Sequence, residues 1–371
     1  METKKVAVVS RAALFTAAVV APLLVAVAGV AAGRTNNCTR RCGGISIPPP
    51  FGIEDGCFLD GFNLTCDRSH QPPKLFLGDG TVEVLEISVP DATVRVIGGF
   101  TYFPGSVDDY SGIPSRVSNP VTAGIWSGAL REAGPYTLAV RRNKLVVIGC
   151  NVQVLVGEDS SEDLGGCSAV CSRRRDVNPR RPVKDCTGAT CCQSEIMLGR
   201  SSYRFRILRV NGATGLNSSA FAWIMESGGL LSSHALFDDD YIPLPLPAVL
   251  NWKINYTVCH GNTSSAACRS SQSYCKNSTG RNTVPNAHLC YCPSGYQGNP
   301  YEPDGCYDLN ECKFPKIYPC YGTCNNTEGG YQCSCPPGYE GNAFAPNGCK
   351  RSYSPHSGNI LSCWANAKSL I

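Results

Sequence analysis

Carboxylate and amide side chains stand beside closely spaced cysteines in residues 308–335, which read DLNECKFPKIYPCYGTCNNTEGGYQCSC. Asp308 and Glu311 come just before Cys312, and Asn326 follows the third cysteine of the segment by two residues. Calcium is a hard cation that takes several oxygen ligands from carboxylates, amides and backbone carbonyls. The cysteines would fix the frame that holds such oxygens. We therefore predict a calcium site formed by the side chains of Asp308, Glu311 and Asn326.

The spacing of these residues is D-x-[DN]-E-C, followed by C-x-[DN]-x4-[FY]-x-C-x-C. It closely resembles the calcium-binding EGF-like module, and every position of that pattern is matched. The resemblance implies calcium as a bound cofactor, with further ligands from the backbone carbonyls of Leu309, Thr327 and Gly330. It also implies one disulfide pairing among about 15 that six cysteines allow: Cys312–Cys324, Cys320–Cys333 and Cys335–Cys349. The alternative is an EGF-like fold that has kept its acidic residues without useful affinity for calcium.

Six cysteines in residues 259–306 resemble a first EGF-like module, which ends in Cys290-Tyr291-Cys292 and Gly295-Tyr296. The disulfides implied by this resemblance are Cys259–Cys275, Cys268–Cys290 and Cys292–Cys306. This module lacks the acidic approach to its first cysteine, so we expect no calcium there. A single residue, Tyr307, separates the two modules. Calcium at that junction is expected to stiffen the pair.

The cysteine content and the N-terminus indicate a secreted protein. The chain has 23 cysteines, which a reducing compartment would keep as free thiols. Lys4, Lys5 and Arg11 precede a run of small and apolar residues up to Ala32, which predicts a signal peptide at residues 1–33. An uncleaved membrane anchor is the alternative, because roughly 20 apolar residues can span a bilayer. We expect no membrane span in the mature chain.

Asn-x-Ser/Thr sequons are candidate N-glycosylation sites that only the secretory pathway would use. They begin at Asn37, Asn63, Asn217, Asn255, Asn262, Asn277 and Asn325. Their number agrees with an extracellular protein.

Residues 38–66 combine a C-x3-C pair, Gly-Gly, three consecutive prolines and Phe-Gly-Ile. Prolines at this density predict a non-helical segment, and a disulfide-rich knot is the simplest interpretation. The order Cys-Gly-x-Ile-x-Ile-Pro-x-Pro-Phe-Gly-Ile resembles the galacturonan-binding N-terminal domain of plant wall-associated receptor kinases. Pro49 stands where that family usually has an aromatic residue. The resemblance implies binding of an acidic cell-wall polysaccharide, pectin.

The fold class is expected to be mainly β and disulfide-rich. Residues 82–87 and 93–96 flank a turn, and residues 136–140 and 145–150 flank a short polar segment, so each pair is predicted to form a hairpin. The Cys186–Gln193 segment resembles the second half of the same ectodomain family. A zinc site at Cys167, Cys171, Cys186 and Cys191 is the alternative to structural disulfides, and the oxidising compartment favours disulfides. The domains expected are a signal peptide (1–33), a galacturonan-binding-like domain (34–150), a second Cys-rich part (151–258), an EGF-like module (259–306), a calcium-binding EGF-like module (307–349) and a divergent, disordered tail (350–371).

Basic residues concentrate in residues 165–210, although residues 34–258 as a whole carry equal numbers of basic and acidic residues. Residues 203–207 alternate with period two, so Arg204 and Arg206 are predicted to share one face of a strand. Arginine forms planar, bidentate hydrogen bonds with carboxylates, which suits a polymer of galacturonate. A solvated, solubilising charge is the alternative. The candidate polysaccharide-binding residues are Arg173, Arg174, Arg175, Arg180, Arg181, Arg204 and Arg206.

We compare three classes of function for this sequence. We favour a pectin-binding protein on a calcium-binding EGF-like stalk, in the cell wall, either secreted or anchored if the chain is a truncated receptor. The second class is a structural scaffold that binds other extracellular proteins through its EGF-like modules and has no sugar affinity. An enzyme is disfavoured, because no spaced carboxylate pair, nucleophile motif, glycine-rich phosphate loop or His-Arg-Asp segment occurs. No nucleic-acid partner is expected.

Overall fold

The structure is a computed structural model, and it describes residues 38–78, 80–103, 120–121, 134–157, 163–171, 186, 188, 190–201, 203–209, 220–228, 245–254, 259, 265–278 and 287–352. Within these ranges the chain forms strands and one short 3₁₀ helix, η1 (Glu311–Lys313). Eleven disulfides link the described residues. The predicted mainly β, disulfide-rich fold class is confirmed. The described residues include no helix that is long and apolar enough to cross a bilayer.

The N-terminal segment is closed on itself by the disulfide Cys38–Cys57 and is linked by Cys42–Cys66 to the first strand of a six-stranded antiparallel sheet. It carries a small two-stranded sheet of β1 (Arg41–Cys42) and β2 (Ile45–Ser46). The larger sheet has the order β3-β4-β5-β6-β16-β9. Its strands are β3 (Leu64–Asp67), β4 (Lys74–Leu77), β5 (Val82–Ser88), β6 (Thr93–Gly98), β16 (Leu246–Trp252) and β9 (Tyr136–Leu138).

The predicted hairpin of β5 and β6 is present in this sheet. Val84 of β5 and Val94 and Val96 of β6 are buried, as the alternation of apolar residues requires. The connecting turn is closed by a 2.8 Å hydrogen bond that Ser88 Oγ donates to Asp91 Oδ2. A short polar side chain is well suited to this role in a turn.

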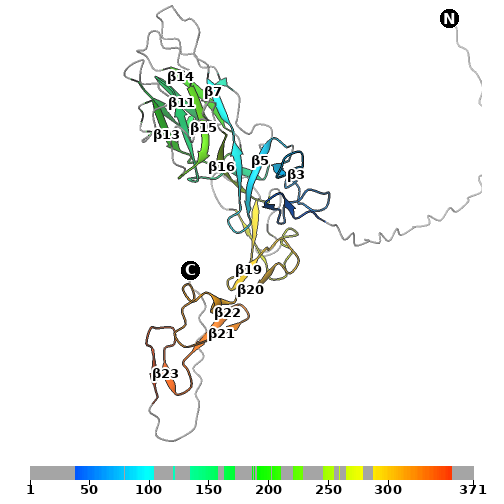
Figure 1. The fold of residues 1–371 in the computed structure, drawn as a ribbon, viewed down its shortest axis with the longest axis vertical. Coiled ribbons are helices and arrows are strands. Elements are labelled where there is room, and N and C mark those ends of the chain that lie inside the picture. The colour runs from blue at the N-terminus through cyan, green and yellow to red at the C-terminus, as the bar shows by residue number, and fades with distance from the viewer. Residues whose placement is uncertain are drawn as a thin grey trace, which may run out of the picture. The chain divides into compact units, whose positions relative to one another are not determined.

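Two further sheets of four strands each lie beside it, with orders β13-β10-β15-β7 and β12-β11-β14-β8. The pairings of β15 with β7 and of β11 with β14 can be followed in Figure 1. The disulfide Cys167–Cys192 joins one sheet to the other. The strands are β7 (Phe100–Phe103), β8 (Pro120–Val121), β10 (Asn143–Ile148), β11 (Val152–Gly157), β12 (Asp163–Ala169), β13 (Cys191–Glu195), β14 (Arg204–Arg209) and β15 (Ala220–Glu226).

The hairpin predicted at residues 136–150 is wrong. β9 pairs with β16, whereas β10 pairs with β13 and β15 in another sheet. The physical reason is the fully buried Asn143, whose Nδ2 donates to the carbonyl oxygens of Ala139 (2.9 Å) and Val249 (2.7 Å) and whose Oδ1 accepts from Val249 N (2.8 Å). These bonds satisfy backbone groups where the chain crosses between sheets, so the two strands need not pair with each other.

One apolar core runs through all three sheets. It includes Val84, Leu138, Val147, Val154 and Phe205, which lie on both sides of residue 150. Strands on both sides of residue 150 also share sheets, since β16 completes the sheet of β3 to β6. The predicted division at residues 150/151 therefore does not fall between sheets.

The EGF-like modules are built from short hairpins and disulfides. The structure pairs their cysteines in the same way as the resemblance implies. Four hairpins follow one another along the chain. Their strands are β17 (Tyr274–Asn277), β18 (His288–Tyr291), β19 (Tyr296–Gly298), β20 (Cys306–Asp308), β21 (Thr323–Thr327), β22 (Gly330–Ser334), β23 (Tyr339–Gly341) and β24 (Cys349–Arg351).

The first EGF-like module shares the core of the sheets. Tyr301 is buried, and its ring lies 5.6 Å from that of Trp252 at the end of β16. Trp252 in turn contacts Phe51 and Phe62 of the N-terminal segment in edge-to-face arrangements, which are favourable for aromatic pairs. Asn299 Nδ2 also donates a 2.9 Å hydrogen bond to the carbonyl oxygen of Pro49. The module is thus packed against the N-terminal segment by both apolar and polar contacts.

Candidate functional site

Asp308 and Asn326, predicted as calcium ligands, lie together at the junction of the two EGF-like modules. Asp308 ends β20, and Asn326 lies in β21. Asn326 Nδ2 donates a 2.6 Å hydrogen bond to Asp308 Oδ2, and the backbone N–H of Gly329 donates a 2.6 Å bond to Asp308 Oδ1. Two charge-assisted hydrogen bonds therefore orient the Asp308 carboxylate.

Glu311, the third predicted side-chain ligand, is in an unusual state for a carboxylate. Only 2% of its surface is exposed, and its Oε2 atom has no hydrogen-bond partner among the described residues. The Oδ1 atom of the neighbouring Asn310 is also buried without a partner there. Burying a charge without compensation is costly, and a bound cation would provide the compensation. Oxygen-only donors of this kind fit calcium.

Asn310 was not among the predicted ligands. Its orphaned amide oxygen makes it a further candidate, and the sequence did contain the signal, because Asn310 fills the [DN] position of the pattern. The residues predicted to offer backbone carbonyls lie close by in the chain. Leu309 N donates a 2.8 Å bond to the carbonyl oxygen of Gly295, and Thr327 and Gly330 face each other at the end of the β21–β22 hairpin.

The turn of that hairpin packs on the first module. A Cβ atom placed on Gly295 would lie 2.2 Å from the carbonyl oxygen of Gly329, so this close approach requires glycine at 295. Tyr296 Oη donates a 3.1 Å hydrogen bond to Glu328 Oε1. Desolvation raises the pKa of Tyr296, with a smaller contribution from the Glu328 bond. Burial also raises the pKa of Tyr331, and the Glu311 carboxylate adds to that shift.

Cysteine clusters do not form zinc sites in the part of the chain that the structure describes. Ligand atoms of Cys268, Cys275 and His288 lie within 4.8 Å of one another, but both cysteines belong to disulfides. The four cysteines weighed as zinc ligands are likewise bonded, in Cys150–Cys171, Cys167–Cys192 and Cys186–Cys191. Zinc binds thiolates, and a disulfide offers none.

Of the predicted polysaccharide-binding arginines, two belong to the described strands. Arg204 and Arg206 lie in β14, where they alternate with the buried Phe205 and Ile207. The Arg206 side chain is half-buried and stands next to Leu155 in the register of β11. Arg173, Arg174, Arg175, Arg180 and Arg181 lie outside the described residues.

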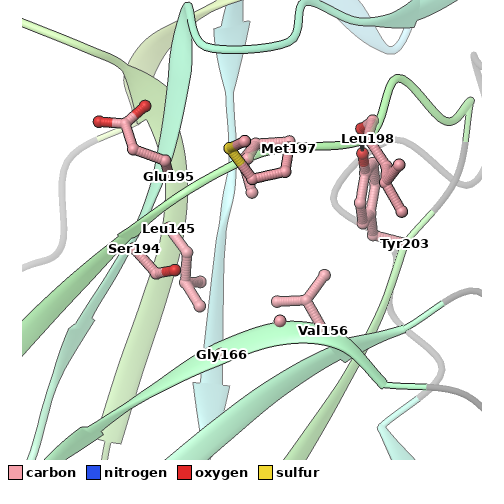
Figure 2. A pocket seen from close by; sticks show the side chains of 10 residues that line it. Leu145, Val156, Gly166, Ser194, Glu195, Met197, Leu198 and Tyr203 are labelled. Carbon is pink, nitrogen blue, oxygen red and sulfur yellow. Dashed lines mark hydrogen bonds between the residues drawn. The ribbon is translucent and has the colours of Figure 1, made fainter.

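A hollow beside β13 is too small for a sugar. Figure 2 shows Ser194 and Glu195 on one side of it, with Met197 and Tyr203 farther along. Its volume is about 20 Å³, which holds about one water molecule.

The predicted sequons are placed as follows. Asn63 and Asn325 are exposed, and Asn277 is half-buried with its Oδ1 accepting a 2.9 Å bond from Cys259 N. Asn37, Asn217, Asn255 and Asn262 lie outside the described residues.

Comparison with known proteins gives two domain matches. The wall-associated receptor kinase galacturonan-binding family matches residues 38–98, and the calcium-binding EGF domain matches residues 308–355. The chain is related to the wall-associated receptor kinases. The predicted resemblance is thereby confirmed, and both matched domains are binding domains rather than catalytic ones.

Individual relatives agree with the domain matches. Wall-associated receptor kinase 2 of Arabidopsis thaliana is 29% identical over 307 residues, which cover 79% of this chain and 37% of the relative. Wall-associated receptor kinase 3 of the same plant is 30% identical over 318 residues, covering 80% and 39%. The chain thus spans about two fifths of the length of these relatives. No solved structure matches the chain.

Proposed function

We propose that this chain binds de-esterified pectin in the plant cell wall through the region that includes residues 38–98. The observation that carries the proposal is the match of those residues to the galacturonan-binding family. The matched residues include the disulfide-linked N-terminal segment and strands β1 to β6. A pectin ligand agrees with the names of the relatives, which are wall-associated.

Arginine side chains are proposed to contact the carboxylates of the polymer. Arg206 lies on β14, a strand with a buried opposite face, so its position is fixed by the sheet. A cation held in place in this way loses less conformational freedom on binding than one on a flexible segment. The same role is proposed for Arg204 and for Arg173, Arg174, Arg175, Arg180 and Arg181.

The calcium-binding EGF-like module is proposed to bind calcium at the module junction. Asp308, Glu311 and Asn326 would supply side-chain oxygens, and Leu309, Thr327 and Gly330 would supply carbonyls. The unpaired, buried Glu311 supports this assignment. A bound cation would compensate the negative charge of the Glu311 carboxylate. The close packing of Gly329 on Gly295 would hold the two modules together at this site. Secretion and use of the seven sequons belong to the same proposal.

The test is binding of secreted, disulfide-bonded protein to a de-esterified oligogalacturonide, with a neutral oligosaccharide as control, over a salt series. We expect selective binding whose affinity falls as salt rises, because exposed charge pairs are screened. The Arg204→Ala/Arg206→Ala variant should bind about tenfold more weakly, if each lost pair is worth up to about 1 kcal/mol.

A matched control removes two positive charges elsewhere. Lys276 and Arg351 are exposed and lie in the EGF-like modules, so Lys276→Ala/Arg351→Ala should leave the affinity for the short oligomer unchanged. Equal binding of the acidic and neutral sugars by correctly folded protein would refute the proposed function and leave the scaffold alternative.

A further inference from the structure

The calcium-binding EGF-like module exposes an unusual loop between its first and second cysteines. Residues 313–317 are all exposed, and Phe314 and Ile317 are 44% and 69% exposed. Tyr321, just after the second cysteine, is 53% exposed. We call residues 313–321 the 313–321 loop. Several exposed apolar side chains in one short segment can form an interaction surface, because their exposure to water is unfavourable.

The 313–321 loop has a fixed backbone. Phe314 N donates to Glu311 O at 2.9 Å, and Ile317 N and Tyr318 N both donate to Phe314 O, at 3.0 and 2.9 Å. The Tyr318 ring lies 5.9 Å from that of Tyr331, whose hydroxyl donates a 3.3 Å bond to Pro319 O. Disulfides of Cys312 and Cys320 hold both ends. A surface ordered before binding loses little entropy when it binds.

The charge of the 313–321 loop indicates an acidic partner. Lys313 and Lys316 are exposed and flank Phe314. Neither lysine forms an ion pair with any of the described residues, and the carboxylate nearest in sequence, Glu311, is buried. The loop therefore presents two available cations beside exposed rings.

We infer that the 313–321 loop is a second contact for galacturonan, distinct from the N-terminal region. A galacturonate residue combines a carboxylate, which pairs with lysine, and an apolar C–H face on its pyranose ring, which packs on an aromatic ring. The loop offers both kinds of group in one short segment. This inference rests on the proposed function only in taking galacturonan as the ligand of the chain.

A second contact has a measurable consequence. A long polymer can engage both regions at once, and the second contact then forms at a high effective concentration. A short oligomer can engage only one. Affinity should therefore rise with polymer length in a manner that depends on the loop.

The experiment compares the full chain with Lys313→Gln/Lys316→Gln and with Phe314→Ala, on a short oligogalacturonide and on long, de-esterified polygalacturonate. Calcium is held constant, because it also bridges galacturonate chains. We expect each variant to bind the long polymer about five- to tenfold more weakly, from lost charge pairs or lost apolar contact amplified by avidity. Binding of the short oligomer should not change.

The matched control is Lys276→Gln/Lys350→Gln, which removes the same charge from exposed sites outside the loop. It should bind the polymer like the unmodified chain. Unchanged calcium affinity and disulfide pairing would show that the loop variants are folded.

The outcomes separate the two proposals. If the polymer binds equally well to the loop variants, the inference is overturned while the proposed function stands, and the loop would serve protein contacts instead. If the short oligomer does not bind but the polymer binds in a loop-dependent way, the function assigned to the N-terminal region fails and the inference stands. If neither sugar binds, both fail.

Discussion

The two EGF-like modules share one disulfide arrangement but differ in what they bury. The first module buries Ala267, Ala287, His288 and Tyr301 in addition to cysteines. In the described part of the second module, residues 308–352, only Glu311 and Ala343 are buried. One module thus adds apolar residues to the core of the sheets, whereas the described part of the other buries only one alanine and one carboxylate.

The difference shows how a small disulfide-linked module can be put to different uses. Three disulfides reduce the entropy of the unfolded chain enough that a large apolar core is not needed. The first module uses its apolar residues to pack against Trp252. The second exposes Phe314 and Ile317 and buries the carboxylate of Glu311, whose Oε2 atom has no hydrogen-bond partner among the described residues.

The largest effect is expected from replacing Tyr301, which joins the first module to the core of the sheets. Tyr301→Ala removes a ring that is 1% exposed and contacts Trp252, and such truncations cost about 3–5 kcal/mol in free energy of unfolding. The measurement is urea unfolding followed by tryptophan fluorescence. Tyr307→Ala, at a ring that is 57% exposed, is the control and should cost less than about 0.5 kcal/mol. Equal effects of the two variants would contradict a shared core.

The Glu311→Gln variant tests the second module. With the charge removed, calcium affinity should fall at least about tenfold, since ligand charge sets the affinity of such sites. In a chelator the same variant should be as stable as the unmodified chain or more stable, because an uncompensated buried charge has been removed.

Calorimetric titration with calcium and thermal unfolding in chelator measure these two effects, and Glu340→Gln at an exposed site is the control. A loss of stability in chelator would mean that the Glu311 carboxylate serves contacts within the protein, not a cation.

The smallest effect concerns the hydrogen bond between the modules. Desolvation and Glu328 raise the pKa of Tyr296, so Glu328→Gln should lower that pKa towards its ordinary value. A raised pKa favours the neutral phenol, so this bond contributes stability below about pH 10, and the contribution is lost as pH rises through the pKa of the folded state. Ultraviolet titration, with Tyr296→Phe subtracted to isolate this phenol, measures the shift. An unchanged titration would mean that the hydrogen bond is absent in solution.

Local spacing was enough to predict part of this molecule. The β5–β6 hairpin and the cluster of Asp308 and Asn326 follow from residues close together in sequence. Contacts between distant segments left no such signal. Asn143 directs β10 away from β9 by bonding to Val249, and no periodicity in residues 136–150 could reveal that partner. The docking of Tyr301 on Trp252 was missed for the same reason.

The pairing of β16 with β6 has a consequence for biosynthesis. The match to the galacturonan-binding family ends at residue 98. Its last strand, β6, nevertheless pairs with a strand far outside the match, where Arg95 lies opposite Val249. At roughly 5–20 residues per second, the ribosome needs about 8 to 30 seconds to deliver the strand that covers this edge. During that interval the edge of β6 has no partner strand, and unpaired strand edges are prone to associate with other chains. The sheet that contains β3 to β6 can therefore be completed only after residue 252 has been synthesised.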